Sequence, residues 1–329
     1  MSEKEASGSC HPRSSADVPA GMDTRAAYAY CLRLARGHYE NFPVASVLIP
    51  SRLRPHVAAV YAFARHADDM ADEGSDAPET RRARIESWRA RLRRVEPWGA
   101  AGTEGAAGTE SAAGREADAS GIHPVFLALG DTIRRFAIPS VLLHDLLDAF
   151  VQDTHTEQYA TFDDVLDYCA RSANPVGRIM LALFGILDDR RAAASDALCT
   201  GLQLVNFWQD VSIDRLKPRV YIPLADLARF GLTVEDILHG SDTAATQRLI
   251  AYQVERTRRF FHAALPLFPR VPFRLRLELA AIWRGGMKVL EKIEKQHYTV
   301  IQSRPALSAT DMLSVLAAAV LKGMPDAGS

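Results

Sequence analysis

Residues 203–214 read QLVNFWQDVSID, from Gln203 to Asp214. Asn206, Asp210 and Asp214 recur at every fourth position, and residues spaced in this way share one face of a helix. The positions between them hold Leu, Val, Phe, Trp and Ile, so this helix is apolar enough to be largely buried. Buried carboxylates need partners, and an oxygen-only set suits a hard cation such as magnesium. The stretch therefore predicts a helix that turns one acidic face towards a metal-assisted site.

A second acidic face occurs earlier, in the stretch YAFARHADDMADE at residues 61–73. Asp68 and Asp72 are four apart, and Arg65 and Tyr61 continue the same stripe towards the start of the helix. Two like charges at this spacing destabilise an isolated helix, so a cation or the surrounding water must compensate. Taken alone, the motif fits a solvated helix end equally well. Together, two such faces across a bundle core predict a site for several magnesium ions and a diphosphate.

The segment after the first-quoted stretch is basic and reads RLKPRVYIP at residues 215–223. Arginine and lysine beside a bound metal are the groups that a phosphate-bearing ligand requires. We favour this role for Arg219, with charges on a solvent-facing loop as the alternative.

The rest of the chain predicts an all-α fold, a single bundle of about ten helices with a central cavity. Alternating β patterns are absent, and apolar residues recur at three- and four-residue spacing. These helical stretches cover residues 26–36, 57–71, 125–136, 141–151, 165–187, 197–214, 246–264 and 275–298. Residues 1–24 predict a disordered tail, residues 25–310 the domain, and residues 311–329 a terminal helix or tail. The Gly-, Ala- and Glu-rich stretch at residues 99–121 predicts a flexible insertion within the domain.

Composition excludes several classes of protein. The net charge is −1, so no global electrostatic attraction to nucleic acid is expected. No apolar run reaches the roughly 20 residues that span a bilayer, and no signal-peptide core is present. The four cysteines lack the close spacing of a zinc site. We therefore expect a cytoplasmic protein. The arginine-rich stretch at residues 81–94 leaves two alternatives open, peripheral contact with the inner face of the membrane or a solvated helix face.

Both acidic motifs and their surroundings resemble the squalene and phytoene synthase family, the head-to-head branch of the isoprenoid synthases. The resemblance covers residues 28–307. It implies an isoprenoid-synthase-type bundle and a magnesium-dependent enzyme that ionises prenyl diphosphates. The metal ligands that it implies are Asp68, Asp69, Asp72, Asn206, Asp210 and Asp214, and it gives Asp68, Asp72, Asp210 and Asp214 the catalytic role. The substrate-binding residues that it implies are His38, Phe42, Tyr61, Arg65, Gln203, Arg219, Tyr221 and Tyr298.

Three departures from the family pattern carry information. Glu40 replaces a basic residue, Gln209 replaces an arginine, and Arg171 replaces a tyrosine implicated in forming the cyclopropyl intermediate. These changes suit an enzyme that holds one diphosphate. The motifs ENFPVAS and RSANPVG resemble the hopanoid-pathway branch, which implies hydroxysqualene synthesis from presqualene diphosphate and water, with Arg171 in the catalytic set. This implies functional coupling to a presqualene diphosphate synthase and to a downstream reductase.

Two other functions remain open at this stage. One is head-to-head condensation of two prenyl diphosphates to presqualene diphosphate, squalene or phytoene. The other is a non-catalytic helical subunit that binds a prenyl diphosphate, although intact acidic pairs argue against a decayed site. No Rossmann fingerprint or other nicotinamide site is evident, so we expect no NADPH.

Overall fold

The computed structural model describes residues 23–37, 48–72, 76–96, 122–217, 219–322 and 325. The predictions for the insertion at residues 99–121, for His38 and Phe42, and for nearly all of the tail lie outside these residues. The helices are α1 (Thr24–Gly37), α3 (Arg54–Asp72), α4 (Pro78–Val95), α5 (Pro124–Phe136), α6 (Val141–Asp153), α7 (Phe162–Ser172), α8 (Asn174–Leu183), α9 (Asp189–Gln209), α10 (Val211–Asp214), α11 (Leu224–Arg229), α12 (Val234–Leu238), α13 (Ala244–Ala264), α14 (Phe273–Lys295) and α15 (Ala309–Lys322), with the 3-10 helix η3 (Leu265–Arg270) before α14.

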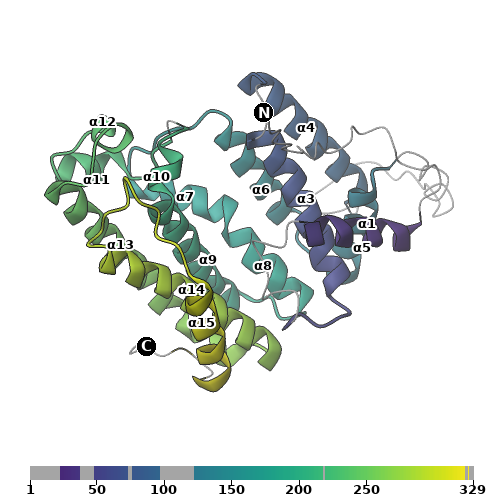
Figure 1. Cartoon of the computed structure of the whole chain (residues 1–329). Coiled ribbons are helices and arrows are strands. Elements are labelled where there is room, and N and C mark those ends of the chain that lie inside the picture. The colour runs from purple at the N-terminus through teal and green to yellow at the C-terminus, as the bar shows by residue number, and fades with distance from the viewer. Residues whose placement is uncertain are drawn as a thin grey trace, which may run out of the picture.

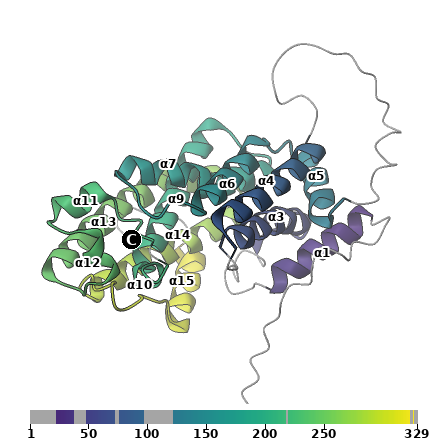
Figure 2. The ribbon, with the colours of Figure 1, turned by 90° about the horizontal axis from the view of Figure 1, so that it is seen from above.

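The prediction of an all-α bundle is confirmed, and Figures 1 and 2 show α1 and α5 at one end with α11 and α12 at the other. The described residues contain no strand, only one isolated parallel bridge between Gln158 and Val220. Within this part of the chain, no helix is both long enough and apolar enough to cross a bilayer. Cys31, Cys169 and Cys199 are free thiols.

Two predicted helices are each divided in the structure. The stretch at residues 165–187 forms α7 and α8, because Pro175 lacks the N–H that would bond the carbonyl of Arg171 and its ring crowds that carbonyl. The stretch at residues 197–214 forms α9 and α10, with Asp210 between them at φ −99° and ψ 8°. The single-helix prediction was therefore wrong for both stretches.

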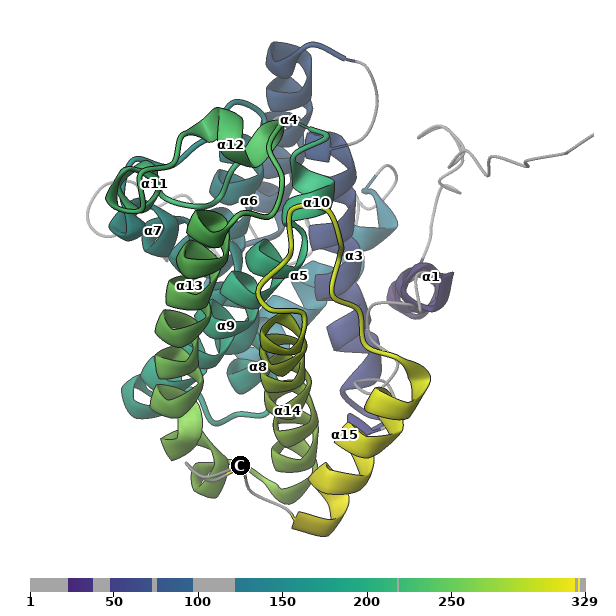
Figure 3. The same ribbon diagram turned by 60° about the vertical axis from the view of Figure 1, so that its left-hand side comes forward.

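The interior consists of two packed clusters. The first surrounds Phe63 of α3, whose ring lies between Trp88 and Phe126. The second surrounds Trp208 and Trp283, and Figure 3 shows the helices that build it, α9, α13 and α14, running alongside one another. Helix α8 contributes to both clusters, so the two halves form one bundle. The first acidic motif thus ends a helix of one cluster, and the second ends a helix of the other.

Candidate active site

The two acidic motifs meet where α3 ends beside the loop after α10. Arg219, in that loop, donates from Nη2 to Oδ1 of Asp72 at 2.9 Å, with Nη1 3.5 Å from Oδ2. The same Nη2 donates to the carbonyl oxygen of Asp153 at the end of α6, at 3.0 Å. The Nζ of Lys217 lies 3.7 Å from Asp72. Arg219 and Asp72 are 147 positions apart in the chain, and their ion pair joins the two halves of the bundle.

The second acidic motif keeps its register despite the break at Asp210. The N–H of Asp210 donates to the carbonyl of Asn206 at 2.9 Å, and the N–H of Asp214 donates to the carbonyl of Asp210 at 2.8 Å. The four-residue spacing predicted from the sequence is therefore preserved by backbone hydrogen bonds. Arg304, from the segment before α15, donates from Nε to Oδ1 of Asp210 at 2.5 Å. Each acidic motif is thus paired with a guanidinium from elsewhere in the chain.

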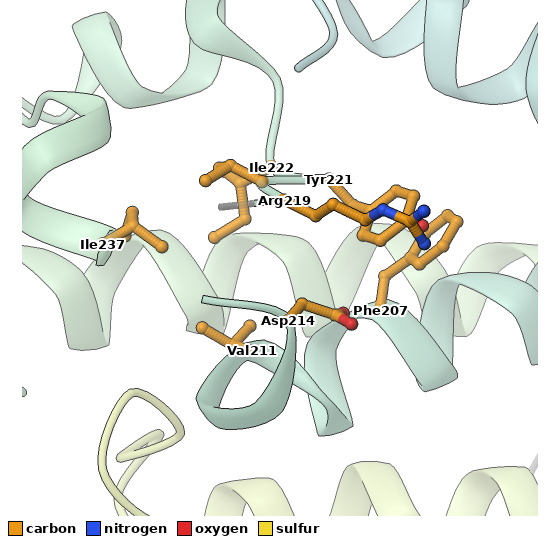
Figure 4. A pocket seen from close by; sticks show the side chains of 8 residues that line it. Phe207, Val211, Asp214, Arg219, Tyr221, Ile222 and Ile237 are labelled. Atoms are coloured by element: carbon orange, nitrogen blue, oxygen red, sulfur yellow. The ribbon is translucent and has the colours of Figure 1, made fainter. Parts of the chain in front are cut away.

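A small pocket lies between the second motif and Arg219. Figure 4 shows the carboxylate of Asp214 and the guanidinium of Arg219 both extending towards Phe207, with the ring of Tyr221 beside them. Phe207 and Tyr221 are stacked, with ring centroids 3.9 Å apart and an interplanar angle of 11°. The pocket therefore combines an acid, a base and an aromatic wall, which are the groups that would receive the polar end of a ligand.

A backbone clamp positions the loop that carries Arg219. The N–H of Val220 donates to the carbonyl of Glu157 at 2.8 Å. The N–H groups of Leu224 and Ala225 donate to the carbonyls of Tyr159 and Ala160 at 2.9 and 3.0 Å. Because these bonds join main chain to main chain, the placement of Arg219 depends little on which side chains surround it.

Burial raises the pKa of two acids at the site. Burial, then the negative charge of Asp210, raises the pKa of Asp214 to about 6, and Arg219 opposes this shift. Burial is also the main cause that raises the pKa of Asp153 to about 7, and Asp72 and Asp68 add to it. The hydroxyl of Tyr168 donates to Oδ2 of Asp153 at 3.0 Å, which partly offsets the shift. The charges of the two acidic motifs therefore influence the pKa values of Asp153 and Asp214.

The raised pKa of Asp153 predicts an unusual pH dependence of the free energy of unfolding. The native protein holds the proton of Asp153 up to a pKa of about 7, whereas the unfolded chain releases it near 3.8. Over that window the unfolded state binds fewer protons, so the free energy of unfolding falls as the pH rises. We expect Asp153→Asn, which keeps an oxygen for Tyr168, to flatten this slope. Urea denaturation in metal-free buffer at pH 5 and pH 7.5 measures the change in the free energy of unfolding with pH. If the wild type and Asp153→Asn changed equally, the raised pKa of Asp153 would not be the cause.

The remaining residues predicted for the first motif lie on α3. Arg65 binds acids of its own helix, with Nη1 3.3 Å from Asp68 and Nη2 2.7 Å from Asp69. Tyr61 is half-buried one turn earlier, and burial raises its pKa while Arg65 lowers it. The predicted stripe of Tyr61, Arg65, Asp68 and Asp72 therefore runs along α3, and its last member, Asp72, contacts Arg219.

Other predicted residues are less closely joined to this centre. Asn206 is exposed and Gln203, one turn earlier on α9, is half-buried. Arg171, in the last turn of α7, pairs with Asp167 of its own helix. Tyr298 follows α14 at φ 61°, where burial, then the charge of Glu294, raises its pKa and Arg258 opposes the shift. None of the hydrogen bonds or ion pairs described joins Arg171 or Tyr298 to the acidic motifs.

The sequence analysis missed three residues of the site, Asp153, Tyr168 and Arg304. Asp153 ends an ordinary apolar helix, and no spacing distinguishes it from a solvated helix-end carboxylate. Tyr168 stands one turn before Arg171 on α7, and no pattern in the sequence distinguishes it from a core tyrosine. Arg304 is 94 residues from Asp210, so only the fold reveals their contact.

The donor set fits magnesium bound together with a diphosphate. Among the described residues, no three His, Cys, Asp or Glu side chains converge to surround one ion. Magnesium does not need such a cage, because it is commonly held by one or two carboxylates, substrate phosphates and water. Asp72 and Asp210 supply carboxylate oxygens from the two acidic motifs, and Arg219 and Lys217, both beside Asp72, offer the charge that a diphosphate requires.

Comparisons with known proteins match most of the chain. Residues 35–311 match the family described as squalene/phytoene synthase. The chain is 35% identical over 214 residues to the hydroxysqualene synthase of Zymomonas mobilis, a match that spans 64% of this chain and 63% of that protein. It is 30% identical over 279 residues to the hydroxysqualene synthase of Sinorhizobium fredii, which spans 83% of this chain and 85% of that protein.

The fold is shared with solved structures. The crystal structure of squalene synthase HpnC from Alicyclobacillus acidocaldarius superposes with a TM-score of 0.73 at 38% identity. The superposition covers 84% of this chain and 96% of that one.

Proposed function

The chain belongs to the squalene/phytoene synthase family, and on that premise we propose that it converts presqualene diphosphate and water into hydroxysqualene and diphosphate, with magnesium, in squalene and hopanoid biosynthesis. The similarity to two hydroxysqualene synthases supports this choice within the family.

The observation that carries the proposal is the position of Arg219. This guanidinium pairs with Asp72 of the first acidic motif and lines the pocket that contains Asp214 of the second. A diphosphate bound here would meet Arg219 and Lys217 as donors, and both acidic motifs would lie within reach of its metal ions. The same residues would then hold the leaving group while its bond to carbon breaks.

The first step of the proposed reaction breaks the bond between the primary carbon and the diphosphate oxygen. The oxygen keeps the electron pair, and Arg219 and Lys217 stabilise the charge that develops on it. Bound magnesium would supply further Lewis-acid neutralisation of this leaving group. The carbon skeleton is left as a cyclopropylcarbinyl cation. Phe207 and Tyr221 line the pocket, and any part of their rings left uncovered by their mutual stacking would tolerate positive charge.

The second step forms a bond between the rearranged cation and the oxygen of one water molecule. The water loses a proton to the diphosphate just released, so atoms and charge balance without an external reductant. Arg171 and Asn174, on either side of the junction between α7 and α8, are our candidates for placing this water. Asn174 accepts a hydrogen bond from the hydroxyl of Thr200 at 3.0 Å, which fixes its amide.

A product assay tests this proposal. The purified protein is given magnesium and either presqualene diphosphate or farnesyl diphosphate, each with and without NADPH, and products are identified by gas chromatography and mass spectrometry. We expect hydroxysqualene from presqualene diphosphate alone, unchanged by NADPH and lost on chelation of magnesium. Farnesyl diphosphate should be left unconsumed; its conversion to presqualene diphosphate would contradict the one-diphosphate reaction.

One contact favours a second candidate, the condensation of two prenyl diphosphates. Gln209, where the family pattern has arginine, donates to the carbonyl of Pro305 at 2.6 Å and carries no charge. Arg304, which precedes Pro305 in the chain, donates from Nε to Oδ1 of Asp210 at 2.5 Å, so a cation still lies beside the second motif. Two separate cationic positions, Arg219 and Arg304, are what two diphosphates would require. The farnesyl diphosphate arm of the assay distinguishes the two reactions.

A further inference from the structure

A groove outside the active site runs along the surface between α14 and α15. The two helices are antiparallel, because Lys292 near the end of α14 pairs with Asp311 near the start of α15 at 2.6 Å. Figures 1 and 3 both show α15 alongside α14 at one edge of the molecule. The groove encloses about 300 Å³, and its lining contains no residue of either acidic motif. Whatever binds here does so independently of the proposed reaction.

The groove has one positive charge without a partner. Arg258 pairs with Glu294 at 2.6 Å, and Lys288 pairs with Glu291 at 2.8 Å. Arg284 also lines the groove and is only 9% exposed. Its Nε is buried without a hydrogen bond, and within the described residues the side chain forms no ion pair. The lining therefore has an excess of one positive charge, located on Arg284.

An unpaired buried cation is costly, and an incoming anion would remove that cost. A guanidinium binds a phosphate or a carboxylate through two parallel hydrogen bonds. Because a single charge is in excess, the matching ligand is a monoanion. A phosphodiester carries one negative charge at neutral pH, whereas inorganic phosphate near pH 7 is partly a dianion. The charge of the groove thus favours a phosphodiester.

The apolar surroundings indicate what the phosphate is attached to. The side chains of Trp283, Met287, Val315 and Ala318 also line the groove and would contact hydrocarbon. On the face of α15 turned away from the groove, the side chains of Leu313 and Val320 are 67% and 68% exposed, and Leu321 is 83% exposed. An exposed apolar face is typical of helices that lie in a membrane interface, and here it belongs to a helix that forms one wall of the groove.

From this geometry we propose that the groove between α14 and α15 binds the phosphate of an anionic membrane phospholipid. Arg284 receives the phosphodiester, and the exposed face of α15 enters the interface. This contact would place the protein on the surface that contains its lipid-soluble substrate and product. This site is separate from the arginine-rich α4, whose exposed Arg82 and Arg93 offer an alternative membrane contact.

Vesicle flotation of the full chain tests the proposal. The vesicles contain phosphatidylcholine with or without phosphatidylglycerol, and binding is measured for the wild type, Arg284→Gln and Ala318→Phe. The second variant fills the groove and leaves its charge intact. We expect phosphatidylglycerol to recruit the wild type and both variants to bind at least about tenfold more weakly, as expected when charge-assisted hydrogen bonds are lost. The matched control Arg274→Gln, an exposed arginine on the same helix, should bind like the wild type.

Several outcomes would overturn the proposal. Equal binding to vesicles with and without phosphatidylglycerol would show that an anionic lipid is not required. Full binding by Ala318→Phe would exclude the groove even if Arg284→Gln failed to fold. Loss of binding in the double variant Arg82→Gln and Arg93→Gln, with Arg284→Gln unaffected, would place the membrane contact on α4 instead. Displacement from vesicles by millimolar inorganic phosphate would identify the ligand as free phosphate.

Discussion

Asp214→Asn lowers kcat for presqualene diphosphate by about 10²–10³-fold, the loss expected when one preorganised electrostatic group of a site is removed. Asn keeps the size of the side chain and removes the charge. That charge faces Arg219 across the pocket and belongs to the acidic face that would bind magnesium. Burial raises the pKa of Asp214 to about 6 in the metal-free protein, and bound magnesium would lower it, so the wild type should lose activity only as the pH falls below that value.

Single-turnover kinetics over a magnesium titration measures this effect. The matched control is Asp189→Asn, an exposed acid in the first turn of the same α9 whose last residues precede Asp214. We expect the control to retain wild-type turnover. A tenfold or smaller effect of Asp214→Asn, with unchanged dependence on magnesium, would show that the second motif does not act through this carboxylate.

Arg219→Gln gives the second large effect, again a fall in kcat of about 10²-fold or more. The variant removes the guanidinium that joins Asp72 to the backbone of Asp153 and lines the small pocket beside Asp214, where the proposed function places the diphosphate. Arg219 also opposes the raised pKa of both Asp214 and Asp153, so its loss raises the pKa of each further. The acid limb of the pH–rate profile should therefore move to higher pH, a change that simple misfolding would not produce.

Two comparison variants separate the charge of Arg219 from its geometry. Arg219→Lys keeps the charge and loses the planar fork, so it should recover only part of the activity. Arg259→Gln, at an exposed position on α13, should behave as the wild type. If Arg219→Lys were fully active, the paired hydrogen bonds to Asp72 would have no role in catalysis.

The local part of this site was predictable from the sequence, because helix periodicity is a local property. The four-residue spacing of Asn206, Asp210 and Asp214 survives as two backbone hydrogen bonds. The break at Asp210 was not predictable, since no proline or glycine occupies that position. Pro175, in contrast, gave a clear signal of the break between α7 and α8 that the apolar pattern concealed.

The contacts between segments far apart in the chain could not be predicted from the sequence. The pairing of Arg219 with Asp72 requires both halves of the bundle to be folded, and that of Arg304 with Asp210 crosses 94 residues. The raised pKa of Asp153 arises from burial, which composition does not report. The sequence thus identified the acids and pointed to Arg219, and the fold showed which acid each arginine contacts and added Arg304.

The backbone clamp between residues 157–160 and 220–225 has an evolutionary consequence. Main-chain bonds do not depend on the identity of the side chains, so substitutions in the apolar interior need not disturb the placement of Arg219. If the proposed function is correct, the groups that ionise the substrate and the walls that decide the fate of the cation can therefore change independently of each other.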